Sequence, residues 1–336
     1  THRYVKKQSG TWQSDSTWIY DTVKKGLLTT EENSTARKTY GYDSLARINK
    51  ETTQIHNQLT TRTFEMSFAY DTYYGRMRGM QYPSGEVLAF EYDKFGYSKQ
   101  DINPATAETY RQILSVNSYG ETASQQFGNG LYSHKEFSTS GELTRVCVND
   151  DTQCSGTNSL DEIAYSEYDN FGNLKAKSDL VNSVSETYIY DNLHRIEQTT
   201  RSATGIVIPE FLPSAIVNYD YDASGNLTLK DDYANTYDYA NGVSGGPNAV
   251  KSVTKLSGNT VNFAYDNNGN MTTGDGTTLT YNAFNKPVSI LKNSVTLTFG
   301  YGADDSRYAQ SARYSDKTVN TYYLGKGYEH IEPIAQ

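Results

Sequence analysis

The chain has 336 residues and a net charge of −9, and only 36% of the residues are hydrophobic although 30 are tyrosine. The acidic balance argues against nucleic acid as a partner, because phosphate binding requires a basic surface. No stretch approaches the roughly 20 consecutive apolar residues of a membrane-spanning helix. Abundant aromatic residues and regular turn signals argue against disorder. Together these features favour a thin sheet whose tyrosines pack their rings and keep their hydroxyls in water.

The first segment, residues 1–36, contains both tryptophans and few turn signals, and we interpret it as divergent repeats. Within it, the segment from Trp18 to Asp21 resembles one such copy. The chain opens at Thr1 with neither an initiator methionine nor a signal peptide, which predicts an excised or processed piece of something longer.

From residue 42 onward, a tyrosine, an acidic or small residue and a short turn with glycine recur along the chain. The clearest copies are YDNFGNL at 168–174, YDASGNL at 221–227 and YDNNGNM at 265–271. Weaker copies begin at Tyr42, Tyr70, Tyr92, Tyr190 and Tyr281, and one without tyrosine spans 137–143. The average spacing of about 23 residues matches a pair of strands with its connections.

Each copy has the local chemistry of a β-hairpin. The aspartate can accept hydrogen bonds from backbone amides two or three residues on, and this starts a turn. The glycine three residues after the aspartate supplies the positive φ of a type I turn with a G1 bulge. The sequence therefore predicts an all-β fold of serial hairpins, with the tyrosines packed between strands. The positions predicted to have this structural role are Tyr42, Asp43, Tyr70, Asp71, Tyr92, Asp93, Tyr168, Asp169, Gly172, Tyr190, Asp191, Tyr221, Asp222, Gly225, Tyr265, Asp266 and Gly269.

No clean linker interrupts the repeats, so we interpret residues 1–336 as one domain. The loosest stretch, residues 240–248, is predicted to be a long loop. Its GVSGG run at 242–246 matches a G-x-S-x-G nucleophile elbow, but no helical pattern follows, which favours a glycine-rich turn. No catalytic residue is predicted.

Cys147 and Cys154 are the only cysteines. The short loop between them could bring the two within disulfide reach, and the compartment decides between a bridge and two free thiols. The histidines are scattered, so neither a metal site nor a cofactor is predicted. The adjacent carboxylates Asp231 and Asp232 would point to opposite faces of a strand, which argues against a glycosidase pair.

The Y-D-x-x-G-N-L pattern resembles the YD repeat of the Rhs proteins, of the B and C subunits of Tc insecticidal toxin complexes, and of teneurins. Residues 81–93 resemble the family's Y-P-S-G variant, and residues 127–131 resemble its G-N-G-L variant. The stretch from Arg307 to Glu329 is similar to the segment that leads towards the family's core region. The resemblance extends over nearly the whole chain.

This resemblance implies a β-strand ribbon that spirals into a segment of a hollow shell, which in bacterial members encloses a C-terminal toxin polypeptide. The implied partners are other YD-repeat segments of the same or a partner subunit, together with that polypeptide. The implied location is outside the producing cell, after secretion or delivery by a toxin complex. The D-P-x-G self-cleavage motif of the family does not occur in the sequence, so self-cleavage is not expected. The alternative function is a surface adhesion or glycan-binding module, which the tyrosine surplus would suit.

Overall fold

The computed structural model describes residues 1–6, 12–57, 60–152, 159–204, 215–239, 244–325 and 327–335. Every regular element in these ranges is a β-strand. None of the described residues forms a helix of the length and hydrophobicity needed to cross a membrane. The prediction of an all-β fold built from serial hairpins is confirmed.

Two antiparallel sheets contain all of these strands. The first sheet contains β1 (His2–Lys6), β2 (Trp12–Tyr20), β3 (Leu28–Asn33), β4 (Ala36–Tyr42), β5 (Ile48–Asn57), β6 (Thr60–Tyr70), β7 (Met77–Gln81), β8 (Val87–Tyr92), β9 (Ser98–Ile102), β10 (Thr109–Val116), β11 (Thr122–Phe127), β12 (Tyr132–Phe137), β13 (Leu143–Asn149), β14 (Asp161–Tyr168), β15 (Leu174–Asp179), β16 (Val184–Tyr190), β17 (Ile196–Ala203), β18 (Ile216–Tyr221), β19 (Leu227–Lys230), β20 (Ala234–Asp238), β21 (Ser252–Lys255) and β22 (Thr260–Asn262). The second sheet contains β23 (Ala264–Tyr265), β24 (Met271–Gly274), β25 (Thr277–Tyr281), β26 (Pro287–Lys292), β27 (Val295–Tyr301), β28 (Arg307–Arg313), β29 (Lys317–Leu324) and β30 (Tyr328–Ala335).

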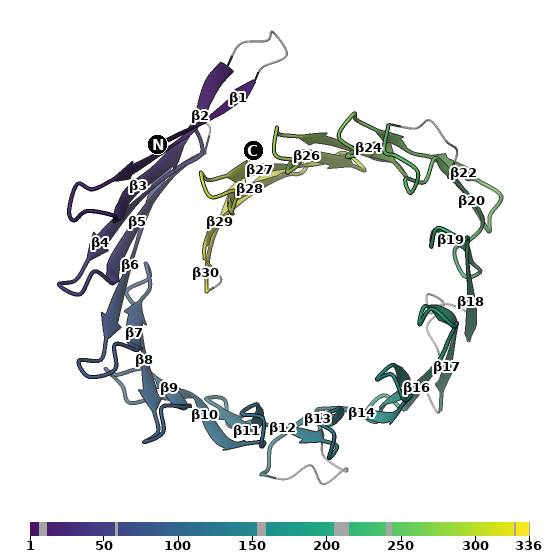
Figure 1. The fold of residues 1–336 in the computed structure, drawn as a ribbon, viewed down its shortest axis with the longest axis horizontal. Coiled ribbons are helices and arrows are strands. Elements are labelled where there is room, and N and C mark those ends of the chain that lie inside the picture. Colours follow the sequence, from purple (N-terminus) through teal and green to yellow (C-terminus); the bar gives the residue numbers. More distant parts are fainter. Residues whose placement is uncertain are drawn as a thin grey trace. The chain divides into compact units, whose positions relative to one another are not determined.

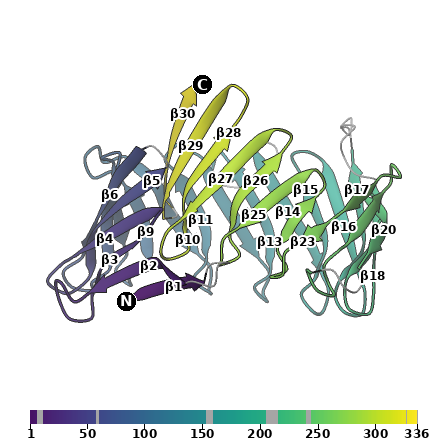
Figure 2. The same cartoon turned by 90° about the horizontal axis from the view of Figure 1, so that it is seen from above.

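Strands pair with their neighbours in the chain, as β4 does with β5 and β16 with β17. Figure 1 follows these hairpins in chain order, and Figure 2 shows β25 to β30 side by side. The register shifts just before the repeat tyrosines, so that Tyr42 lies opposite Ile48 and Tyr221 lies opposite Leu227. Such a bulge bends the strand and strengthens its local twist.

The chain divides into two compact units. The first unit contains Thr1–Val87, Asn241–Ala249 and Asn262–Gln336, and the second contains Leu88–Ala240 and Val250–Val261. The interpretation of the chain as one domain stays a prediction. Of the predicted long loop at 240–248, residues 244–248 are described and contain no strand, while the others lie outside the described residues.

The main apolar core of the first unit forms where strands from both ends of the chain meet. Figures 1 and 2 place β28 to β30 beside β4 to β6. The buried residues of this core are Ala36, Ile55, Phe64, Tyr308, Ala309, Tyr322 and Leu324, with Met66 and Tyr328 packed against them. Since most strand residues elsewhere are only half-buried, this core is where large-to-small substitutions should cost most stability.

Alternate connections of an antiparallel sheet lie on the same edge, because successive strands reverse direction. In the second unit, the turns that follow β8, β10, β12, β14, β16 and β18 share one edge, and most of them are predicted YD turns. The turn at Phe127–Leu131, which carries the G-N-G-L variant, follows β11 and lies on the opposite edge. The YD turns and the G-N-G-L turn therefore lie on opposite edges of the sheet.

Candidate functional site: the repeated turn and the strand junction

The turn beginning at Asp222 shows how each repeat closes. The Asp222 amide donates to the Asn226 carbonyl at 2.9 Å, and the Gly225 amide donates back to the Asp222 carbonyl at 3.0 Å. The Asp222 carboxylate accepts from the amides of Ser224 and Asn226, each at 2.8 Å. The same pair of backbone bonds closes the turns that begin at Asp43, Tyr82, Asp93, Asn117, Phe127, Ser138, Asp169, Asp191, Lys255, Asp266, Asn282 and Gly302.

The aspartate contacts differ slightly from the predicted ones. The amides bonded by the carboxylate in this turn are two and four residues on, because the bulge brings the fourth amide back towards the side chain. The turn at Asp71 is one residue longer, closing onto Arg76, and there the carboxylate accepts from the amides of Tyr73, Tyr74 and Gly75.

The fourth position of the turn has a left-handed backbone. Gly172, Gly225 and Gly269 have φ values of 84°, 85° and 86°, which is the sign that the sequence predicts. Other turns place Ala46 and His194 here, at φ values of 65° and 62°. A non-glycine residue therefore fits when it adopts the left-handed helical region, at a cost of roughly 1–2 kcal/mol.

We expect Gly225→Val to lower the free energy of unfolding by about 1–3 kcal/mol, because a β-branched residue is strained at this φ. The nearest atom to an added Cβ is a nitrogen of Arg195 at 4.0 Å, so the cost is conformational and not steric. Gly225→Asn is the matched control, since Asn285 already occupies the equivalent position at φ 59°. If urea unfolding shows that Gly225→Val is as stable as Gly225→Asn, this explanation is wrong.

The side chain of the residue after the glycine donates a hydrogen bond to the second carboxylate oxygen of the aspartate. The sequence did not lead us to predict this role. Asn173 and Asn226 donate through Nδ2 to the carboxylates of Asp169 and Asp222 at 2.8 and 2.9 Å. In other copies an arginine replaces the asparagine: Arg195 Nε donates to Asp191 at 2.7 Å. The guanidinium carbon of Arg195 also lies 4.4 Å from the ring centroid of Tyr221, in the next copy. The recurring asparagine of the G-N-L pattern was the available signal.

Most of the repeat tyrosines bind the copy before them. The Tyr190 hydroxyl donates to the Leu174 carbonyl at 2.7 Å, and Leu174 is the last residue of the preceding YDNFGNL motif. The equivalent bonds join Tyr42 to Leu28, Tyr70 to Ile48, Tyr168 to Leu143, Tyr221 to Ile196, Tyr239 to Leu227, Tyr281 to Met271 and Tyr301 to Pro287. The expectation that the tyrosine hydroxyls stay in water is wrong for these residues, because the hydroxyl instead satisfies a backbone carbonyl.

Burial raises the pKa of the repeat tyrosines, which keeps each hydroxyl protonated and able to donate. This applies to Tyr42, Tyr70, Tyr168, Tyr190, Tyr221, Tyr265, Tyr281 and Tyr301.

We expect Tyr190→Phe to lower the free energy of unfolding by about 1 kcal/mol, because it leaves the half-buried Leu174 carbonyl without this donor. Tyr97→Phe, at a side chain that is 57% exposed, should change it by less than about 0.5 kcal/mol. Equilibrium urea unfolding of both variants measures the difference. Equal losses would show that the hydroxyl bond contributes nothing beyond ring packing.

The turn aspartates make the fold sensitive to acid. Hydrogen bonds from the Asn226 side chain and from backbone amides hold the pKa of Asp222 below its usual range. Backbone and Arg76 hydrogen bonds lower that of Asp71 to about 2. The pKa values of Asp43, Asp169, Asp191 and Asp266 are lowered in the same way. A depressed pKa contributes stability that is present above the unfolded-state value, near 3.9, and is lost as the pH falls through the folded value.

The unfolding temperature should therefore fall steadily as the pH is lowered from about 5 to about 2, where these carboxylates become protonated. Asn117 and Asn282 already begin turns of the same geometry, so Asp222→Asn keeps the turn and removes one titrating group. The unfolding temperature of the triple variant Asp222→Asn, Asp169→Asn and Asp266→Asn should depend less steeply on pH. If the unfolding temperature of the triple variant falls with pH as steeply as that of the unsubstituted protein, groups other than these aspartates cause the acid sensitivity.

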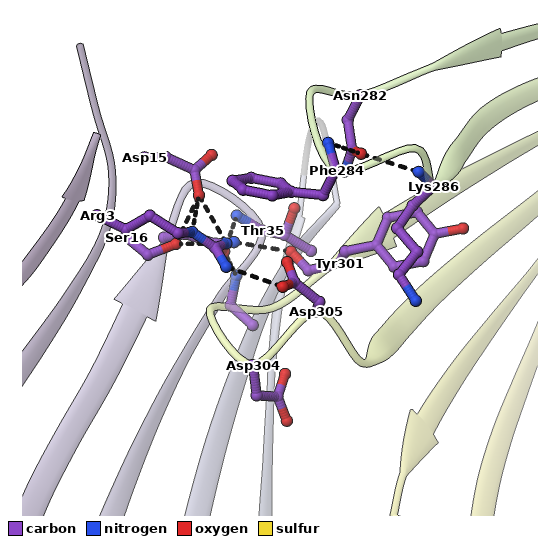
Figure 3. Close-up of polar contacts among 12 residues, drawn as sticks. Arg3, Asp15, Ser16, Thr35, Asn282, Phe284, Lys286, Tyr301, Asp304 and Asp305 are labelled. Atoms are coloured by element: carbon purple, nitrogen blue, oxygen red, sulfur yellow. Dashed lines mark hydrogen bonds and ion pairs between the residues drawn. The ribbon is translucent and has the colours of Figure 1, made fainter. Parts of the chain in front are cut away.

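A second feature is the junction that Arg3 makes between the N-terminal hairpin and the turns of the second sheet (Figure 3). Arg3 donates to the Asp15 carboxylate at 3.0 and 2.8 Å and to the Asp305 carboxylate at 2.9 Å. Its guanidinium carbon lies 3.9 Å from the ring centroid of Phe284. Burial alone would lower the pKa of Arg3, but its hydrogen bonds to Asp305 and Asp15 raise it, so the guanidinium keeps its charge between the two carboxylates.

Close backbone contact supports the same junction. Asn33 donates from Nδ2 to the Tyr301 carbonyl at 2.8 Å, and its Oδ1 accepts from the Thr35 amide at 2.9 Å. A Cβ at Gly300 would lie 2.7 Å from Cγ2 of Thr35. A side chain at residue 300 would therefore force Thr35 to shift where β27 passes the connection between β3 and β4.

A second set of contacts joins β6 to β29 and β30 through an ion pair and packed aromatic rings. Arg62 on β6 donates to Glu332 on β30 at 2.7 and 3.2 Å. The Phe64 ring lies 5.8 Å from that of Tyr322 and 5.6 Å from that of His330. Ion pairs, apolar burial and ring contacts thus join strands that are more than 250 residues apart in the sequence.

The remaining predicted site residues lie as follows. Cys147 is fully buried on β13 and disulfide-bonded, whereas Cys154 lies outside the described residues, so their pairing stays a prediction. Among the residues that the structure describes, no group of three or more histidine, cysteine, aspartate or glutamate side chains could hold a metal ion.

Comparison with known proteins gives a fold. No protein-family model matches the chain, and no curated protein matches it significantly. The crystal structure of TcdB2-TccC3 superposes with a TM-score of 0.74 over 97% of this chain and 19% of that chain, at 14% identity. The structure of TcdB2-TccC3-Cdc42 superposes with a TM-score of 0.71 over 98% of this chain and 19% of that chain, at 13% sequence identity. The structure of TcdB2-TccC3 without its hypervariable C-terminal region superposes with a TM-score of 0.73 over 98% of this chain and 18% of that chain, at 14% sequence identity.

The fold is shared. At such low identity the likeness extends to the fold alone, and this chain spans about a fifth of the length of those chains. In this chain, the tyrosine and turn contacts described above stabilise that fold.

Proposed function

We propose that this chain is a structural segment of the wall of a shell, of the type that Rhs and Tc-type toxins build around a toxic polypeptide. The observation that carries the proposal is the series of hairpins in which a tyrosine of one copy bonds the backbone of the copy before it. Such a series extends a sheet without needing a thick core, which suits a wall. The fold shared with TcdB2-TccC3 supports the same conclusion.

In this role the chain is not an enzyme. Its partners are further YD-repeat segments of the same or a partner subunit and the enclosed polypeptide, and it acts after delivery by a bacterial secretion or toxin-complex system. The repeat tyrosines, aspartates and glycines set the shape of the wall. The Arg3 junction and the Phe64 core hold strands from the two ends of the sequence together.

Protease protection in the complete gene product tests the proposal. An enclosed polypeptide should resist a protease that digests the same polypeptide when it is expressed alone. Phe64→Ala, which removes a ring from the junction core, should accelerate that digestion, and Tyr73→Ala, at a side chain that is 92% exposed, should not. Digestion at the rate of the free polypeptide in the intact product would rule out enclosure.

A surface adhesion or glycan-binding role is the second candidate, and one observation favours it. Tyr73 and Tyr74 are adjacent in one turn and are 92% and 77% exposed, a presentation that suits stacking on sugar rings. A glycan array should then show binding that a Tyr73→Ser, Tyr74→Ser variant loses. An empty array would remove this candidate.

A further inference from the structure

A cavity of about 390 Å³ lies in the first unit, with walls from β4–β7 on one side and from β28 and β29 on the other. Cavities of about 300–1,000 Å³ that are lined mainly by apolar side chains and by a few polar ones are typical of small-ligand sites. The proposed wall function gives this cavity no role, although it is lined by both kinds of side chain.

The floor of the cavity is charged at one end and apolar at the other. It consists of residues that share one face of β4, β5, β6 and β7, and their register pairs Lys38 with Thr53, Glu51 with Met66, and Phe68 with Met80. Residues directly opposite each other in an antiparallel pair project to the same face. Because neighbouring strands lie about 4.8 Å apart, the floor extends roughly 14 Å from its charged end on β4 and β5 to its apolar end on β6 and β7.

The roof comes from the other end of the sequence. Tyr308 on β28 and Leu324 on β29 are 6% and 4% exposed, and both line the cavity. An added Cβ on Gly327 would lie 3.3 Å from the Tyr82 hydroxyl, and the rings of Tyr82 and Tyr328 lie 6.1 Å apart at an angle of 20°. Gly327 and Tyr328 therefore pack against Tyr82, which follows β7, and the cavity requires strands from both ends of the sequence.

Two polar groups at the charged end are not saturated by the part of the chain that the structure describes. Glu51 lies 2.9 Å from the ammonium of Lys38, and among the described residues its carboxylate has no second ion-pair or hydrogen-bond partner. Thr53 is 3% exposed, and no described residue donates to its hydroxyl or accepts from it. In the second unit, by contrast, the half-buried carboxylate of Glu186 binds three side chains. Since buried polar groups are almost always hydrogen-bonded, Glu51 and Thr53 indicate a ligand that both would bind.

The charged end has an excess of negative charge. Burial raises the pKa of Tyr308, and three nearby carboxylates raise it further, those of Asp304, Glu31 and Glu51. Glu31 is only 7% exposed, so salt in the solvent screens its charge weakly. Lys38 supplies one positive charge beside these groups. Three carboxylates and one ammonium leave an excess of negative charge, which favours a cation over an anion as the ligand.

We propose that the cavity binds a small amphipathic amine, whose ammonium group bonds Glu51 and Thr53 and whose apolar body lies on β6 and β7. An ammonium carries the charge that this end favours, and it donates the hydrogen bonds that the two groups can accept. Met66 and Met80 suit the apolar body, because unbranched methionine side chains adapt to the shape of a bound group. Such a site is independent of the proposed wall function, since it requires only the folded first unit.

Isothermal titration calorimetry with three probes that share one apolar body tests the site: phenylbutylamine, phenylbutyrate and phenylbutanol. At neutral pH the amine should bind this 336-residue chain about tenfold more tightly than the acid or the alcohol. Thr53→Val removes the hydroxyl and keeps the shape of the side chain, and Glu51→Gln removes the charge. Each should weaken binding of the amine by roughly tenfold and leave that of the alcohol nearly unchanged. Lys38→Met should instead tighten binding of the amine, because it removes the competing cation.

Met80→Ala locates the probe, because it should weaken the amine and the alcohol alike, whereas Tyr73→Ala, at a side chain that is 92% exposed, should weaken neither. Equal binding of amine and acid would overturn the proposal, as would the absence of saturable binding or amine binding that survives both Glu51→Gln and Thr53→Val. The comparison of probes needs no substitution, so a variant that fails to fold does not remove the test. Failure of the probes would leave the wall function standing, and loss of protease protection would reject the wall and leave the amine site.

Discussion

Tyr322→Ala should lower the free energy of unfolding of the first unit by about 3–5 kcal/mol, the largest single effect that we expect in this unit. Tyr322 is fully buried, and its ring packs against Phe64 and His330 between strands from the two ends of the sequence. Removing the ring leaves a cavity that flanking strands cannot fill, because each is held by its own ladder of hydrogen bonds.

Tryptophan fluorescence during urea unfolding reports on this change, because both tryptophans lie in the first unit. Tyr73→Ala is the control, since that side chain is 92% exposed and its removal should change stability by less than about 0.5 kcal/mol. A loss below about 1 kcal/mol for Tyr322→Ala would mean that the two sets of strands do not stabilise each other.

Arg145→Met should cost the second unit about 3–5 kcal/mol, because it leaves a buried carboxylate without its cation. Glu162 is 1% exposed, and it accepts hydrogen bonds from two nitrogens of Arg145 and, at 2.6 Å, from the Ser159 hydroxyl. The Ser159 bond and Arg145 outweigh burial and hold the pKa of Glu162 below its usual range. Without Arg145 that pKa should rise above the unfolded value.

The pH dependence and a double variant identify the cause. The stability deficit of Arg145→Met should shrink as the pH falls through the raised pKa of Glu162 in the variant, which lies above the unfolded value of about 4.3, because the carboxyl then becomes neutral. Arg145→Met with Glu162→Met should recover most of the loss. Lys175→Met, which breaks the exposed pair with Glu167, should cost less than about 1 kcal/mol. If the loss of stability in Arg145→Met does not change with pH, its cause is the lost packing of the aliphatic part of the arginine side chain.

The sequence predicted what is local. The YDNFGNL, YDASGNL and YDNNGNM motifs identified the hairpins and the left-handed glycines, because a turn is determined by the few residues within it. The same reasoning missed the bond from Tyr190 to Leu174, since which carbonyl a hydroxyl reaches depends on the register between copies. It also gave no sign that Asp305 binds Arg3, 302 residues away in the sequence.

The junction was beyond sequence reasoning for the same reason. Nothing near Phe64 in the chain indicates that it packs against Tyr322, because both lie in alternating strands that look like any others. Contacts between distant segments need either the fold or an alignment in which paired positions vary together.

The parity of the strands limits how such a chain can grow or shrink. Because alternate turns share an edge, adding or losing one strand would transfer every later YD turn to the other edge and reverse every later strand. Changes in length must therefore come as whole hairpins, about 23 residues at a time. A hairpin such as the one at Tyr190 carries both the tyrosine that binds its predecessor and, at Ile196, the carbonyl that binds its successor, so a duplicate of such a copy arrives with both halves of its joints. Gene duplication can then lengthen the sheet without designing a new contact.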